Sequence, residues 1–202
     1  MILLILAVTL IRGSPGDSVC SKALSAGPES YRIVDSLLTE LRRRSFPELA
    51  GVEVTLNQIR SPSDYFTSGT ELRTIWNGGR KRSYLVYVNP RLYRDPPSRD
   101  ALLAVMAHEL GHIVDYERRS ATGLAGFTVR YLTRDRARYE RETDLGALRR
   151  GYGCGLIDYR EWLYRHVSPA AAAAKRRDYL TPAEIRAWLI NEAAAPSGRL
   201  PG

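Results

Sequence analysis

The sequence predicts an α+β domain, because its strand-like segments come early and its helix-like segments come late. Two short apolar segments, residues 52–57 and 83–89, have the alternation or β-branched and aromatic content of strands. Longer segments with helical spacing of apolar residues follow from residue 99 onward. We therefore expect a small N-terminal sheet with an edge strand beside an active-site helix, followed by a helical C-terminal lobe.

The first half of the chain divides into one helix and the expected sheet. Residues 29–44 place Ile, Val and Leu at helical spacing, which predicts an amphipathic helix. Residues 61–82 are rich in Ser, Pro and Gly and predict a loop, with one short strand at residues 72–76. The strand predicted over 83–89 is closed by Pro90.

The second half reads as a series of helices. Ser98 is a candidate N-cap for a helix over residues 99–116, and Gly123 and Gly126 predict a loop after it. Further helices are expected over residues 134–150, 156–167, 169–178 and 182–193. The last begins with Thr181-Pro182-Ala183-Glu184, which combines an N-cap, a first-turn proline and a capping-box glutamate.

The N-terminus carries the pattern of an export signal. Residues 2–11 are apolar but too few to span a bilayer as a helix, and Ser14 and Gly16 offer a cleavage site. We expect residues 1–16 to be a signal peptide, the mature protein to be periplasmic or extracellular, and no stable transmembrane anchor to remain. No basic residue precedes the apolar run, so a buried first strand is the alternative.

The remaining chain has the size of one domain, expected over residues 17–195, with a flexible tail over 196–202. Hydrophobic residues make up 44% of the chain, enough for a sizeable core. Two cysteines, Cys20 and Cys154, could form one disulfide in an exported protein, but the sequence does not show whether they meet.

The chain is basic, with 30 Lys and Arg against 22 Asp and Glu. The arginines are scattered, and no aromatic-interleaved basic stripe or nucleic-acid-binding motif accompanies them. We therefore interpret them as a solvated surface and expect no nucleic-acid partner. A basic nucleic-acid-associated protease remains an alternative.

The segment His108-Glu109-Leu110-Gly111-His112 carries the chemistry. Residues four apart on a helix share one face, so His108 and His112 can bind one Zn²⁺. Glu109 projects beside them and can act as general base toward a zinc-activated water. The segment predicts a zinc-dependent hydrolase.

A catalytic zinc site needs a third protein ligand. The three-histidine extension of the motif is excluded, because Asp115 and Arg118 stand where it requires Gly and His. The remaining histidine, His166, lies on a late helix without matching spacing, so a carboxylate is the better candidate.

Glu140 and Asp144 provide that carboxylate and a supporting one. They lie four residues apart on one helix face, whereas Glu142 points away from it. One of these two carboxylates can serve as the third ligand, and the other can accept the non-ligating N–H of a histidine. The small side chains of Thr143 and Ala147 would let this face approach the first helix.

The HELGH and YERETD segments together resemble the gluzincin metallopeptidases, which share HExxH followed by ExxxD. The order of HELGH, YERETD and a helical tail near YLTPAEI also resembles uncharacterised bacterial metallopeptidase-like proteins. The resemblance covers residues 83–153 and implies a zinc peptidase with peptide or protein substrates. The resemblance implies three zinc ligands, a general base and a carboxylate that orients a histidine. These roles fall on His108, His112 and Glu140, on Glu109, and on Asp144, in that order. An inactive zinc-binding or interaction protein is the alternative function.

The resemblance also implies two features of substrate binding. Residues 83–89 would form the sheet edge that receives an extended peptide. A Tyr or His would stabilise the oxyanion, and the sequence does not choose among Tyr131, Tyr139, Tyr152, Tyr159 and His166. Substrate specificity and oligomeric state are not encoded in any motif that we find.

Overall fold

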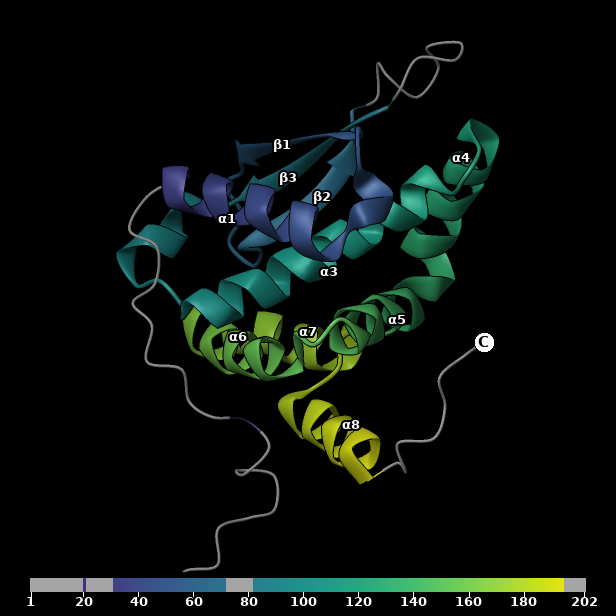
Figure 1. The fold of residues 1–202 in the computed structure, drawn as a ribbon. Helices are drawn as coiled ribbons and strands as arrows, with labels where there is room; N and C mark the ends of the chain where they lie inside the picture. The colour runs from purple at the N-terminus through teal and green to yellow at the C-terminus, as the bar shows by residue number, and fades with distance from the viewer. Residues whose placement is uncertain (1–19, 21–30, 72–81, 195–202) are drawn as a thin grey trace, which may run out of the picture.

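The computed structural model describes residues 20, 31–71 and 82–194. The expected signal peptide, the short strand at 72–76 and the tail at 196–202 lie outside the described residues. Within them, one three-stranded sheet is combined with helices that dominate the C-terminal part (Figure 1). The predicted α+β class is confirmed.

Helix α1 (Tyr31–Ser45) is amphipathic, as its sequence spacing predicts. Its buried side chains are Val34, Leu37, Leu38 and Leu41. A short 3₁₀ turn, η1 (Pro47–Leu49), follows and buries Leu49. The hydroxyl of Tyr31 donates a hydrogen bond to the carbonyl of Leu56, which joins the start of α1 to the sheet.

The sheet contains β1 (Glu53–Gln58), β2 (Phe66–Thr70) and β3 (Ser83–Val88), in the order β1-β3-β2. Strand β3 pairs parallel with β1 and antiparallel with β2. The predicted strand at 83–89 is therefore present, but its assignment as the edge strand is wrong because β3 is central. The edge beside helix α3 is formed by β2.

The burial of β3 explains its central place. Tyr84, Val86 and Val88 are fully buried on one face, and the opposite face is half-buried. A strand that is apolar on both faces is typical of the interior of a sheet, where other elements cover both of its faces. Strand β2 has the sequence FTSGT, whose polar and small residues do not alternate, so no strand was expected there.

Helix α3 (Arg99–Glu117) crosses the middle of the molecule, with the sheet and α1 on one side and helices α5 to α8 on the other (Figure 1). The 3₁₀ turn η2 (Pro90–Arg94) precedes it, and the Ser98 hydroxyl caps it by accepting from the amide of Ala101 at 3.2 Å. Because neighbours cover nearly its whole circumference, α3 buries side chains on several faces. The site residues on α3 are therefore held in a rigid environment.

After α3 the chain forms α4 (Ala121–Arg130), a π-helical turn η3 (Tyr131–Asp135) and α5 (Arg136–Arg149). The loop expected around Gly123 and Gly126 is wrong, because both residues lie inside α4. Each glycine costs a helix only about 1 kcal/mol relative to alanine. Burial of Leu124 and Phe127 on α4 offsets that cost.

The C-terminal lobe consists of α6 (Gly153–His166), α7 (Pro169–Asp178) and α8 (Pro182–Ala194). The predicted capping box is present: Thr181 Oγ1 accepts from the Glu184 amide, and the Glu184 carboxylate accepts from the Thr181 amide. None of the described helices combines the length and hydropathy needed to cross a bilayer.

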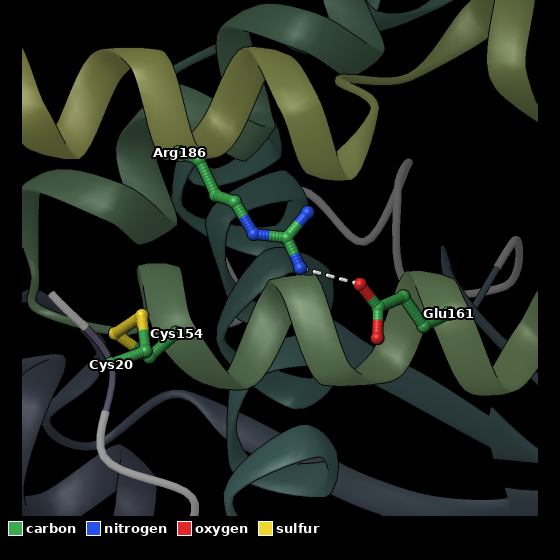
Figure 2. The surroundings of a disulfide bond; sticks show 4 residues. All are labelled: Cys20, Cys154, Glu161 and Arg186. Carbon is green, nitrogen blue, oxygen red and sulfur yellow. Dashed lines mark hydrogen bonds and ion pairs between the residues drawn. A yellow bond between two sulfur atoms is a disulfide. The ribbon is translucent and has the colours of Figure 1, made fainter. Parts of the chain in front are cut away.

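Helix α6 packs closely on the start of α3 because Gly155 lacks a side chain. A Cβ at this position would lie 2.2 Å from the carbonyl oxygen of Asp100. Cys20 and Cys154 form a disulfide at the first turn of α6, with their Cα atoms 5.5 Å apart (Figure 2). The ion pair between Arg186 and Glu161, at 2.6 Å, joins α8 to α6 (Figure 2). The question that the sequence left open for the two cysteines is thus settled by the fold.

Candidate metal centre

Helix α3 presents His108, Glu109 and His112 in the interior of the molecule. Their relative exposures are 3%, 6% and 6%, which is low for polar side chains. Buried polar groups require partners. The two imidazoles find theirs on helix α5.

Helix α5 approaches α3 at a point where both helices have small residues. A Cβ at Gly111 would lie 3.1 Å from Cγ2 of Thr143, so the absence of a side chain at Gly111 permits the contact. Glu140 and Asp144 project from the same face of α5 and are buried, whereas Glu142 is exposed. The predicted division of the three acids between the two faces of the helix is observed.

Three donor atoms from these helices converge. Nε2 of His108 lies 3.0 Å from Nε2 of His112 and 3.1 Å from Oε2 of Glu140. Nε2 of His112 lies 3.2 Å from the same Glu140 oxygen. Among the described residues, these three form the cluster of side chains able to hold a metal ion.

This donor set fits zinc in both geometry and chemistry. Ligands at 2.0–2.1 Å around a tetrahedral Zn²⁺ are separated by roughly 3.3 Å, close to the separations of the three atoms here. Two imidazoles and one carboxylate are also the three-ligand set of many catalytic zinc sites, which leave the fourth position open. The roles of His108, His112 and Glu140 as ligands remain predictions.

Asp144 fixes the orientation of the His108 ring. Its Oδ1 accepts from Nδ1 of His108 at 2.8 Å, which leaves Nε2 facing the cluster. The same oxygen accepts from Nη2 of Arg160 at 2.8 Å, and Oδ2 accepts from the Leu180 amide at 2.9 Å. Asp144 is fully buried, so these contacts compensate its charge.

The charges of the cluster are strongly coupled. Burial lowers the pKa of His108, but its hydrogen bonds and charge interactions with Asp144 and Glu140 dominate and raise that pKa to about 10. Burial raises the pKa of Glu140, but the hydrogen bonds from His108 and His112 dominate and lower it well below its usual range. The cluster therefore stabilises a negatively charged Glu140 beside a positive charge. In the metal-free fold that positive charge is the protonated His108, and a metal ion could replace the proton.

Of the five oxyanion candidates, Tyr131 is the one whose hydroxyl binds a predicted ligand. Its hydroxyl donates a hydrogen bond to Oε1 of Glu140, the oxygen that does not face the imidazoles. Tyr131 begins the π-helical turn η3, a type of irregularity that is frequent at functional sites. Burial, and then the Glu140 charge, raise the pKa of Tyr131, so its hydroxyl stays protonated and able to donate.

The other candidates have different surroundings. Tyr139 stacks on His112 with ring centres 5.0 Å apart, and its hydroxyl donates to Asp115. The hydroxyl of Tyr152 forms a hydrogen bond with the hydroxyl of Ser45, and the ring of His166 forms one with the carboxylate of Asp95. Tyr159 lies beside His108 and Glu109 in the lining of a small pocket.

That pocket opens next to the predicted general base. Its apolar lining comes from β2, α3 and α6, and its polar lining includes Arg160, Lys175 and Tyr179. These three residues were not predicted from the sequence. Arg160 and Lys175 lie outside any motif, and Tyr179 opens the YLTPAEI segment without a predicted role. The packing of α6 on α3, and of α7 on α5 and α6, brings them to the site.

Comparison with known proteins supports the same chemistry. Residues 75–142, about a third of the chain, match the family model of peptidase family M48. The match includes the HELGH segment and Glu140 and ends before Asp144. Searches among curated proteins and among solved structures gave no match. Family M48 comprises metal-dependent peptidases, typically zinc enzymes, and the resemblance of this chain to the zinc metallopeptidases is therefore confirmed.

Proposed function

We propose that this protein is a zinc-dependent peptidase in which His108, His112 and Glu140 hold the metal and Glu109 is the general base. The observation that carries the proposal is the convergence of three buried donor atoms, from two helices, within 3.2 Å of one another. A bound zinc ion would polarise a water molecule and the substrate carbonyl.

Each residue of the site has a defined task in this mechanism. Glu109 accepts the proton of the attacking water and passes it to the leaving amine nitrogen. Asp144 holds the His108 ring in one orientation by accepting from Nδ1. The Tyr131 hydroxyl would turn its proton from Glu140 to the carbonyl oxygen of the substrate and stabilise the negative charge that develops there.

The substrate is a peptide segment bound in extended form. Strand β2 ends the sheet on the side of α3, and its outer edge has no partner strand among the described residues. An added strand would satisfy the free amides and carbonyls of that edge. Phe66 on β2 lines the pocket that contains Glu109, so a peptide bound along this strand lies near the general base.

Export of the protein is part of the proposal. The disulfide between Cys20 and Cys154 is of a kind that persists in oxidising compartments and is rare in the cytosol. It is consistent with the signal peptide expected from residues 1–16. Mass determination of the protein secreted from its natural host would test the expected cleavage.

Hydrolysis of an unstructured protein tests the function. The zinc-loaded full chain is expected to cleave casein, and Glu109→Gln is expected to lower the rate about 10²–10⁴-fold while zinc stays bound. Glu142→Gln, the same change on an exposed face of α5, should leave the rate unchanged. Zinc-loaded wild-type protein that cleaves no peptide would instead favour the zinc-binding interaction protein.

A further inference from the structure

The pocket beside the candidate metal centre has a cationic wall. Among the described residues that line it, Arg160 and Lys175 are cationic, and Glu109 is the acidic one. We propose that this pocket receives an acidic side chain of the substrate, from a residue flanking the scissile bond. The inference rests on the proposed peptidase function and adds a specificity to it.

The two cations contact the same aromatic ring. The guanidinium carbon of Arg160 lies 4.4 Å from the ring centre of Tyr179, and Nζ of Lys175 lies 5.1 Å from it. The Tyr179 ring is itself 5.7 Å from the His108 ring. Both positive charges are therefore fixed within reach of a residue next to the reacting bond.

Arg160 retains an unused donor. Its side chain is 3% exposed and its Nη2 binds Asp144, but Nε is buried and has no hydrogen-bond partner among the described residues. A buried N–H without an acceptor is unfavourable, so an incoming carboxylate that accepts from it would be stabilised. Asp144 lies behind Arg160 and is not part of the pocket lining.

Lys175 also has N–H donors that could bind a second carboxylate. One of its three N–H donors binds Oδ1 of Asp64 at 2.5 Å. The other oxygen of Asp64 accepts from the hydroxyls of Ser61 and Ser63, each at 2.9 Å. Asp64 therefore keeps its own hydrogen bonds when Lys175 binds a second carboxylate.

The apolar lining strengthens the selectivity for charge. Phe66, Val105, Leu163 and Tyr159 exclude water from the walls, and ion pairs are stronger where the surroundings are less polar. The pocket is small, about 20 Å³, so it admits only the end of a side chain. The amide oxygen of a glutamine could also accept from Arg160 and Lys175, but it carries no charge and would form no ion pair. We expect the pocket to distinguish Glu from Gln.

Peptide binding without turnover provides the test. The zinc-loaded Glu109→Gln chain is titrated with fluorescent peptides that differ only by Glu or Gln at either position flanking the expected scissile bond. At one of these positions, the Glu peptide should bind about tenfold more tightly than the Gln peptide. Adding Lys175→Gln should reduce the ratio to about three, because Arg160 alone remains to bind the carboxylate, whereas Arg177→Gln should preserve the ratio. Arg177 is the matched control, because it lies on the same helix with a side chain that is 74% exposed.

Three outcomes would overturn the specificity: equal binding of the Glu and Gln peptides, a Glu preference that Lys175→Gln leaves unchanged, or no binding of either peptide. Failure of the peptidase function is seen separately, as a lack of casein cleavage by the zinc-loaded wild-type chain. Cleavage of casein together with equal binding of the two peptides would refute the pocket assignment alone.

Discussion

Asp144 accepts a hydrogen bond from Nδ1 of His108 at 2.8 Å, from a position that is fully buried between two helices. Because Arg160 binds the same oxygen, the carboxylate links the candidate metal centre to the cationic pocket. A change at Asp144 therefore acts on metal binding and on stability together.

Asp144→Asn should weaken zinc binding about ten- to hundredfold without abolishing it, because the ring of His108 loses its charged acceptor. It should also lower the free energy of unfolding by about 3–5 kcal/mol, because Arg160 is left buried without a counter-charge. Chelator competition and denaturant titration measure the two effects. Glu140→Ala should reduce zinc affinity more than Asp144→Asn does. The opposite order would show that the ligand assignment is wrong.

Zinc affinity should rise with pH. The pKa of His108 is raised from 6.5 to about 10 in the metal-free fold, so zinc must displace a proton from the site below that pH. We expect about a tenfold gain in affinity per pH unit between about pH 7 and 9, measured by chelator competition. Affinity that does not change over this range would contradict the prediction.

The metal-free protein should show the opposite trend in stability. A folded pKa above the unfolded value stabilises the fold fully below pH 6.5, and this contribution is lost as pH rises through about 10. Thermal unfolding of the chelator-treated protein at a series of pH values measures it. His108→Gln in the same series should remove this part of the pH dependence.

Tyr131→Phe should lower the rate of peptide hydrolysis about 10²–10³-fold, mainly through kcat, if its hydroxyl stabilises the oxyanion. Zinc stoichiometry should be preserved, because none of the three predicted ligands is removed. Tyr152→Phe is the matched control, since the hydroxyl of Tyr152 binds Ser45 instead of a residue of the site. Equal rates for Tyr131→Phe and wild type would exclude this role.

Reduction of the disulfide between Cys20 and Cys154 should lower the free energy of unfolding by about 2–5 kcal/mol, because the bond closes a long loop in the unfolded chain. Denaturation with and without reductant measures the effect. The double variant Cys20→Ser/Cys154→Ser should have the lower stability under both conditions. If reductant still lowered the free energy of unfolding of the double variant, the effect would not come from this disulfide, and the prediction would be wrong.

The sequence by itself sufficed to predict the residues of the candidate metal centre. Residues four apart on a helix share a face whatever surrounds them, so the local spacing sufficed to predict the pairs His108 with His112 and Glu140 with Asp144. The α+β class followed equally from local periodicity, which the helices and strands preserve.

Only the tertiary structure decided which segments meet. It placed β3 in the centre of the sheet and β2 at the edge, because strand order depends on pairing between distant residues. It also joined Cys20 to Cys154 and brought Arg160, Lys175 and Tyr179 beside Glu109. Contacts of this kind arise from the packing of α6 on α3 and of α7 on α5 and α6, and no local spacing along the chain specifies them.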